Sequence, residues 1–307
     1  MSESPTDTGR LVGIEVRNSG MIAVCLEKDG SVKDTLKTSK DESEDPALHL
    51  GSFVSNLKEK FGQFDSVGLA VPGLINQQTR RVAYSTHIHE HTEINILGEL
   101  ERLAGVRIHI ENDANAAAYG EYHLGAGRGS KDMFYVTLGE GVGGALIFDN
   151  ELWHGDSGFA GEFGYVAVNS EGLRLEDLAS AQNIIRRTKD RFHQDPTSSL
   201  NEIGEDNITL SDIVREAQAE DDFAQLMLER TGLYVGTALA GVINLLNVEK
   251  IVIGGKIMEA GHLVLDAITA RAKELSFAPS FETVEIVEAE LGEKSSAIGV
   301  ALLSDIQ

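Results

Sequence analysis

The stretch ENDANAAA, residues 111–118, decides the fold class of this chain of 307 residues. It follows the apolar run VRIHI at 106–110, which is predicted to be a strand, and its alanines begin a predicted helix that continues to Tyr122. Polar side chains at such a junction lie at the carboxyl end of the strand, the edge where open α/β sheets bind ligands. Asp113 is therefore either the cap of the helix or a carboxylate that takes a proton from a substrate hydroxyl, with Asn112 beside it to hold a neighbouring hydroxyl.

Strands and helices alternate along the rest of the chain. Hydrophobic periodicity predicts helices at 46–61, 95–104 and about 223–246, and strands at 65–71 and 250–253. The apolar run 233–248 is short for a membrane span and is typical of a buried helix. Residues 194–210 are polar and are predicted to form either a surface insertion or a loop between helices. Strands that alternate with helices predict sheets covered by helices, which is the α/β class.

A strand, a tight turn and a second strand occur once in each half of the chain. Residues 11–16 and 21–26 flank a polar turn and lead to a third predicted strand near 31–37. Residues 133–138 and 145–148 flank the glycine-rich stretch 139–144 in the same way. This repetition predicts a duplicated fold in which each lobe offers a turn to one cleft.

The composition limits the classes of partner. Hydrophobic residues make up 42% of the chain, enough for a packed core, and the net charge of −23 disfavours nucleic acid and anionic membranes as partners. The single cysteine, Cys25, excludes an intrachain disulfide and a cysteine-based zinc site, and it is expected in the core. The polar N-terminus lacks the pattern of a signal peptide, so a cytoplasmic location is expected.

Over nearly its whole length the chain resembles the ROK family of sugar kinases and sugar-responsive regulators. The matching segments keep their order and spacing, and they are LAVPGLIN (69–76), ENDANAAAYGEYHLGAGRG (111–129), YVTLGEGVGG (135–144), the run 150–164 that ends in GFAGEFG, and IVIGG (251–255). The resemblance implies a two-lobed actin-like ATPase fold, ribonuclease H-like and of the sugar kinase type. It implies an N-terminal lobe of residues 1–118, completed by a C-terminal helix at 294–307, and a C-terminal lobe of residues 119–293.

The resemblance also implies a role for each site residue. Asp113 corresponds to the general base of the family. The sugar-binding residues that it implies are Gly73, Asn112, Glu162, Tyr165 and Glu176. Those implied for ATP and Mg²⁺ are Glu15, Gly139, Glu140, Gly141, Gly143, Gly144, Gly254 and Gly255. Such residue types suit a kinase, which needs a base on the attacking hydroxyl, a metal beside the phosphates, and glycine turns whose N–H groups approach them.

Both phosphate turns depart from the family pattern. The first, usually D-x-G-G-T, reads Glu15-Val16-Arg17-Asn18-Ser19, which keeps a carboxylate but replaces both glycines. Arg17 is either an added positive charge or a surface arginine in an altered loop. In the second turn Glu140 replaces a threonine. A carboxylate ~4 Å from a phosphate charge costs about 1 kcal/mol in water and roughly 4 kcal/mol at an effective dielectric of 20.

The zinc motif of the family is also altered. Tyr165 stands in place of a histidine, and VAVNSEGLR (166–174) replaces the cysteine-rich loop, so no zinc of the family type is expected. His87, His89 and His91 alternate in STHIHEHTE, where they form either a metal site or a polar surface or cleft lining.

Two functions from different classes follow. One is an ATP- and Mg²⁺-dependent, glucokinase-like sugar kinase that acts on a hexose or amino-sugar hydroxyl. The other is a catalytically impaired, kinase-derived protein (a pseudokinase) that binds a sugar or regulates. The first phosphate strand begins near Leu11, which leaves no room for the DNA-binding domain of the family's regulators. A homo-oligomer is expected, because dimers are common among similar proteins.

Overall fold

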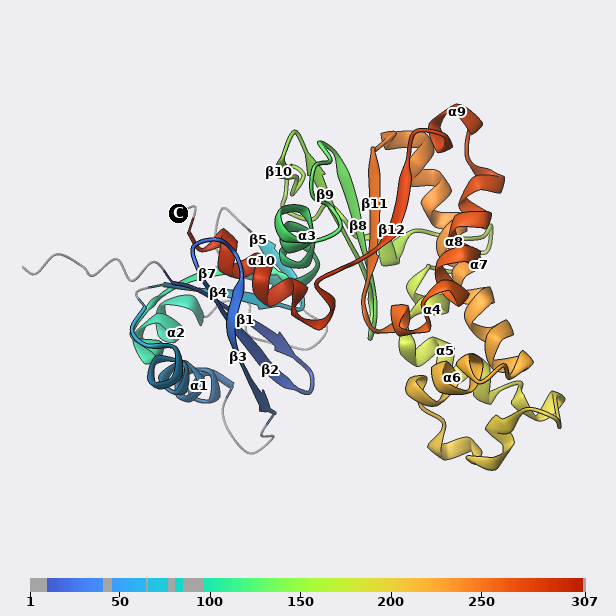
Figure 1. Ribbon diagram of the computed structural model, residues 1–307, viewed down its shortest axis with the longest axis horizontal. Helices are drawn as coiled ribbons and strands as arrows, with labels where there is room; N and C mark the ends of the chain where they lie inside the picture. Colours follow the sequence, from blue (N-terminus) through green and yellow to red (C-terminus); the bar gives the residue numbers. More distant parts are fainter. Residues whose placement is uncertain (1–9, 41–45, 65, 77–80, 85–95, 306–307) are drawn as a thin grey trace, which may run out of the picture. The chain divides into compact units, whose positions relative to one another are not determined.

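The computed structural model describes residues 10–40, 46–64, 66–76, 81–84 and 96–305 (Figure 1). The chain forms two compact units. The first contains the chain up to Arg128, the segment Leu152–Ala160 and the chain from Glu293 onward, and the second contains Gly129–Glu151 and Gly161–Gly292. These boundaries differ from the expected one after residue 118, which falls inside a continuous helix, α3 (Asp113–Leu124).

The sheet of the first unit has the order β3-β2-β1-β4-β7. Its strands are β1 (Leu11–Arg17), β2 (Gly20–Leu26), β3 (Val32–Ser39), β4 (Ser66–Val71) and β7 (Arg107–Asn112). The first three strands are antiparallel neighbours, whereas β1, β4 and β7 run parallel. The carboxyl ends of β1, β4 and β7 therefore share one edge, where ligands bind in such sheets.

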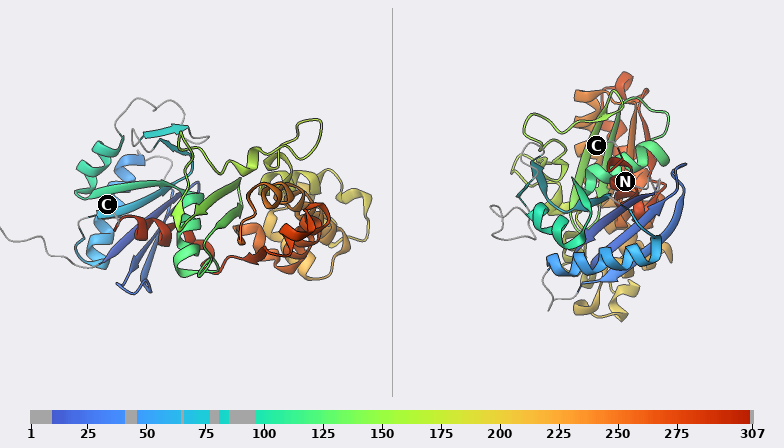
Figure 2. Two further views of the ribbon diagram at one scale, coloured as in Figure 1. Left: turned by 90° about the horizontal axis from the view of Figure 1, so that it is seen from above. Right: turned by 90° about the vertical axis from the view of Figure 1, so that its left-hand side faces the viewer.

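Alternate residues of β4 explain how the helices cover the two faces of this sheet. Val67, Leu69 and Val71 join the core beneath α1 (Pro46–Phe61) and α2 (Ile96–Ala104) (Figure 2). Ala70, on the opposite face, packs with residues of α3 and α10 (Ser295–Leu303). Gly68 must be small there, because an added Cβ would lie 2.0 Å from the carbonyl oxygen of Val300. The short hairpin β5 (Leu74–Asn76) and β6 (Arg81–Tyr84) follows β4.

The sheet of the second unit has the order β10-β9-β8-β11-β12. Its strands are β8 (Met133–Leu138), β9 (Val142–Phe148), β10 (Glu151–Leu152), β11 (Lys250–Gly254) and β12 (Glu285–Glu288). β8 pairs antiparallel with β9 and parallel with β11, as β1 does with β2 and β4 in the first unit. The strand–turn–strand pattern that the sequence repeats therefore occupies equivalent places in the two sheets.

The helices and short 3₁₀ turns of the second unit lie in the C-terminal half of the chain. They are η1 (Phe163–Tyr165), α4 (Glu176–Ala179), α5 (Ala181–Lys189), η2 (Phe192–Gln194), η3 (Ser199–Glu202), η4 (Glu205–Asn207), α6 (Leu210–Gln218), α7 (Asp222–Leu246), η5 (Lys256–Ala260), α8 (His262–Leu275) and α9 (Ala278–Phe281), and η6 (Gly292–Lys294) leads back to the first unit. Within the described chain α7 is the one helix long and apolar enough to cross a membrane, with a mean hydropathy of 1.2, but 56% of that apolar window is buried. It packs against α6 and α8, as expected for a core helix.

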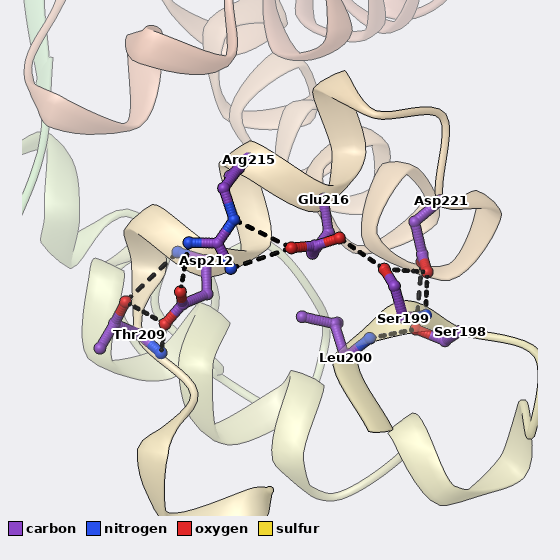
Figure 3. Close-up of polar contacts among 8 residues, drawn as sticks. All are labelled: Ser198, Ser199, Leu200, Thr209, Asp212, Arg215, Glu216 and Asp221. Atoms are coloured by element: carbon purple, nitrogen blue, oxygen red, sulfur yellow. Dashed lines mark hydrogen bonds and ion pairs between the residues drawn. The ribbon is translucent and has the colours of Figure 1, made fainter. Parts of the chain in front are cut away.

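The connection between α5 and α6 is an ordered polar network (Figure 3). Ser199 donates its hydroxyl to Glu216 of α6 (2.6 Å) and to Asp221 (3.0 Å). Asp221 caps the N-terminus of α7 by accepting from the amide of Ala224. Thr209 and Asp212 form a reciprocal capping box at the start of α6. The loop predicted at 194–210 thus lies between helices, and its side chains fix two helix starts. Cys25 is fully buried, as predicted.

Candidate functional site

The junction of β7 and α3 holds Asn112 and Asp113 in the first unit. Asn112 has an extended backbone (φ −63°, ψ 144°) and caps α3, because its Oδ1 accepts from the amides of Ala114 (2.9 Å) and Asn115 (3.0 Å). Its Nδ2 donates to the carbonyl of Gly73, 3.0 Å away. The structure therefore brings Asn112 and Gly73 together, and it leaves the Asn112 amide one N–H with which to hold a ligand.

The interpretation of Asp113 as the helix cap is wrong. Asp113 is already the first residue of α3, and its Oδ1 accepts from the amide of Ala114 at 3.0 Å. The cap is one residue earlier because a cap needs non-helical backbone, which Asn112 has. The half-buried carboxylate of Asp113 thus lies in the first turn of α3, the end of a helix at which acidic side chains are stabilising.

Sequence reasoning missed Glu111, which is only 2% exposed. Its carboxylate accepts from the amide of Asn112 (2.8 Å) and from the Asn115 side chain (3.0 Å), and it faces the His154 Nε2 at 3.0 Å. Burial raises the pKa of Glu111, but these hydrogen bonds and the His154 charge outweigh it and leave that pKa below its ordinary value. The only signal in the sequence was a glutamate next to Asn112, and nothing there pointed to His154.

The first phosphate turn holds an internal ion pair. Arg17 Nη2 lies 2.6 Å from Glu15 Oε2, and the same guanidinium donates to the backbone carbonyl of Glu293, whose carboxylate pairs with Lys37 at 2.6 Å. Arg17 ends β1 with 30% of its side chain exposed, and its guanidinium contacts both Glu15 and the backbone carbonyl of Glu293.

The contacts of Glu15 do not suit a magnesium ion in this arrangement. Its side chain is 13% exposed and already has a cation in contact. Burial raises the pKa of Glu15, although the hydrogen bond and charge of Arg17 oppose that change. A divalent ion at this carboxylate would have to displace the guanidinium of Arg17.

The second phosphate turn is tighter than the glycine-rich stretch suggested. β9 begins at Val142, opposite Leu138, so the turn itself spans residues 139–141 and the later glycines belong to the strand. The amide of Gly139 donates to the carbonyl of Gly141 at 2.9 Å. Gly144 is required inside β9 because an added Cβ would lie 2.8 Å from the carbonyl oxygen of Gly161.

Glu176 braces this turn from α4. Its Oε2 accepts from the amide of Val142 at 3.0 Å and would lie 2.9 Å from a Cβ added at Gly141. The first residue of α5, Ala181, donates its amide to the carbonyl of Gly139 at 2.8 Å. The structure therefore unites Glu176, expected on the sugar side, with the glycine turn, expected on the phosphate side.

Glu162 follows Gly161, whose backbone crosses β9 at Gly144. Burial, and next the charge of Glu176, raise the pKa of Glu162. These two carboxylates therefore influence each other within the second unit. Tyr165 is 52% exposed, and the guanidinium of Arg174 lies 4.7 Å from the centre of its ring.

Backbone hydrogen bonds hold the segment that replaces the zinc loop. Val168 donates its amide to Leu173 (2.9 Å), and Leu175 donates to Val166 (2.9 Å). The Asn169 side chain accepts from the amides of Glu171 (3.1 Å) and Leu173 (3.0 Å). In the part of the chain that the structure describes, no group of three His, Cys, Asp or Glu side chains could hold a metal ion. His87, His89 and His91 lie outside the described residues.

Gly254 and Gly255 end β11, the parallel neighbour of β8. Gly255 has φ 95°, and an added Cβ would lie 2.4 Å from the carbonyl oxygen of Leu138. Gly255 therefore requires glycine next to the start of the 139–141 turn, and an added Cβ at Gly254 would lie 2.5 Å from the Tyr135 hydroxyl, which would have to move. The second unit thus contains the glycines that were expected to bind phosphate, together with Glu162 and Glu176, whereas Asn112, Asp113, Gly73 and Glu15 belong to the first unit.

Comparison with known proteins gives a consistent result. The profile of the ROK family matches residues 12–306. A glucokinase from Halalkalibacterium halodurans is 30% identical over 306 residues, which cover 94% of this chain and 92% of that enzyme. The xylose repressor of Bacillus subtilis is 23% identical over 310 residues, 95% of this chain and 76% of the repressor.

Among solved structures, a ROK family glucokinase from Streptomyces griseus, in complex with glucose and AMPPNP, is 26% identical with a TM-score of 0.87. The match covers 97% of this chain and 100% of the glucokinase. The likeness confirms the predicted fold class, the actin-like ATPase fold of the sugar kinases.

Proposed function

Because the chain belongs to the ROK family and is sugar kinase-like, we propose that it transfers the γ-phosphoryl group of ATP to a hydroxyl of a hexose or an amino sugar. The observation that carries the proposal is the position of Asp113. Its carboxylate opens α3, directly after an Asn112 whose side chain is fixed by three hydrogen bonds. The Streptomyces griseus relative, solved with glucose and a nucleotide analogue, supports a sugar and a nucleotide as the ligands.

Each side chain has a chemical task in this proposal. Asp113 accepts the proton of the attacking sugar hydroxyl, and the free N–H of Asn112 donates to a neighbouring hydroxyl. Glu162 accepts from further sugar hydroxyls. Burial, and next the charge of Glu176, raise the pKa of this carboxyl group.

The phosphates are assigned to the glycine turn at 139–141. A ligand can approach the backbone of Gly139 closely, because a Cβ added there would meet nothing within 4 Å. Backbone N–H groups in such turns bind phosphate oxygens. Magnesium supplies charge neutralisation in phosphoryl transfer, but Glu15 is engaged by Arg17, so no step is assigned to a metal at that carboxylate.

The experiment compares wild type with Asp113→Asn in coupled turnover on a panel of hexoses and amino sugars. The variant removes the base but keeps the shape, so turnover is expected to fall ~10²–10⁴-fold while sugar affinity, measured by calorimetry, changes little. Equal turnover of the two proteins would overturn the role of Asp113.

A second function, sugar binding without phosphoryl transfer, is favoured by one observation. The Glu15–Arg17 pair fills the place where the family has a carboxylate followed by glycines. If wild type binds a sugar by calorimetry but neither binds ATP nor turns over, this second function holds.

A further inference from the structure

A buried carboxylate joins the β7–α3 corner to the segment Leu152–Ala160, here called the strap. The strap begins at the last residue of β10, belongs to the first unit, and is followed by Gly161 of the second unit, one residue before Glu162. His154 in the strap contacts Glu111 at 3.0 Å, across 43 residues of sequence. The carbonyl of His154 also accepts from the amide of Ala160 at 3.0 Å, so the same residue closes the strap on itself.

Glu111 links His154 to the residues of the proposed site through its two carboxylate oxygens. One of its oxygens, Oε1, accepts from the Asn112 amide and from the Asn115 side chain, and the other, Oε2, faces His154. Asn112 is the cap that sets the start of α3, and hence the place of Asp113. A buried carboxylate that lost one of these partners would reorient or take up a proton, and Asn112 would move with it.

The imidazole of His154 contacts Glu111 through one nitrogen, Nε2, which lies 3.0 Å from Oε2 of that carboxylate. A neutral imidazole presents an N–H at this nitrogen in only one of its two tautomers, whereas the imidazolium always does and adds a positive charge. Among its surroundings, Glu111 is the charged group in contact. His109 lies two residues before Glu111 on the same face of β7, Asp113 begins α3, and Asp156 in the strap is exposed.

We propose that His154 is a positioning residue, which in its protonated form holds Glu111, and through it Asn112 and Asp113, in the geometry of the sugar kinase reaction. The proposal rests on the function proposed above and adds a built-in dependence on pH. The hydrogen bond that the ring donates to Glu111 raises the pKa of His154 above its ordinary value, although partial burial opposes this. The favourable contact is therefore complete below the ordinary pKa of histidine and is lost as the pH rises through the raised value. The corner is therefore held below the ordinary pKa of histidine and is released above the raised pKa of His154.

The test uses the full-length protein and the variants His154→Gln, Glu111→Gln and the double variant. His193→Gln is the matched control, because His193 makes a similar contact with Glu205 (3.1 Å) that is exposed and lies in the other unit. Turnover is measured against pH with sugar and ATP varied separately. His154 is followed by NMR titration of its ring, and unfolding of all variants is measured in urea.

In the expected result, wild-type kcat falls as the pH rises through the raised pKa of His154. His154→Gln has a kcat about 10–100-fold lower, the usual effect of a small misplacement, and its kcat does not show that fall. KM for ATP stays within about threefold of wild type, because the nucleotide turns lie elsewhere. The ring of His154 titrates above the ordinary histidine pKa and returns toward it in Glu111→Gln. In urea, the loss of unfolding free energy in the double variant differs from the sum of the losses in His154→Gln and Glu111→Gln, which shows that the two side chains are coupled. His193→Gln behaves as wild type.

Ordinary titration of His154, or no coupling in the unfolding cycle, overturns the proposal. Coupling without any change in the pH profile of kcat also overturns it, because a merely structural pair would behave in that way. If the unfolding data show that positions 111 and 154 are coupled but wild type has no kinase turnover, the proposed function alone fails. The pH dependence of sugar affinity, measured by calorimetry, then supports the proposal if it disappears in His154→Gln and overturns it if it persists.

Discussion

Replacing Arg17 by alanine is expected to show how much the ion pair with Glu15 contributes to the stability of the fold. Glu15 is almost buried, and the Arg17 guanidinium 2.6 Å away is the cation in contact with it. Without that partner the carboxylate loses a charge-assisted hydrogen bond, so burial is no longer opposed and the pKa of Glu15 rises further.

The magnitude follows from the exposure of the two side chains. Breaking a fully buried ion pair by removing one partner costs about 3–5 kcal/mol, whereas an exposed pair contributes about 0–1 kcal/mol. Glu15 is near the buried limit, but 30% of the Arg17 side chain is exposed, so solvent screens part of the interaction. We expect Arg17→Ala to lower the free energy of unfolding by about 1–3 kcal/mol at neutral pH.

The pH dependence identifies the cause. A carboxyl group whose folded pKa is raised contributes stability below its unfolded pKa, and this stability is lost as the pH rises through the folded value. The variant should therefore be close to wild type near pH ~4, where Glu15 is protonated, and the difference should grow toward neutral pH. Urea unfolding at a series of pH values measures this directly.

Lys37→Ala is the matched control, because it removes an exposed cation from Glu293 in the same cluster, and its effect should stay within about 0.5 kcal/mol. The freed Glu15 should also give divalent manganese an oxygen ligand, so Mn²⁺ binding, followed by electron paramagnetic resonance, should strengthen in Arg17→Ala. Equal stability of Arg17→Ala and wild type at neutral pH, with unchanged Mn²⁺ binding, would refute the reasoning.

Two further substitutions test other parts of the chain. Glu140→Thr removes a negative charge and restores a donor beside the glycine turn, so calorimetry should show ATP affinity higher by roughly 1–3 kcal/mol; tighter binding by wild type would mean that Glu140 helps to hold a metal. Asp221→Ala removes the cap of α7 and an acceptor of the Ser199 hydroxyl. Unfolding in urea should show a free energy of unfolding lower by about 1–2 kcal/mol, whereas Asp222→Ala, at the exposed neighbouring residue, should change it little.

Local patterns in the sequence were sufficient for most secondary structure. The helix predicted at 46–61 is α1 with the same bounds, and the strands predicted at 133–138 and 250–253 differ from β8 and β11 by at most one residue. Periodicity succeeds because a helix or strand buries one face, and the spacing of its apolar residues follows from that face alone. The strand predicted at 145–148 began too late, because Gly143 and Gly144 look like a turn. Gly144 lies inside β9 because the backbone of Gly161, distant in sequence, crosses it there.

By itself the sequence determined the α/β class, the strand–helix junction that carries Asn112 and Asp113, and the burial of Cys25, since each depends on residues close together in the chain. Only the tertiary structure decided the partners of the charged side chains. Glu111 meets His154 across 43 residues, and Arg17 meets the backbone of Glu293 across 276. A charge pairs with whatever the fold brings within a few ångströms, and that choice depends on how distant strands and helices pack rather than on any local pattern.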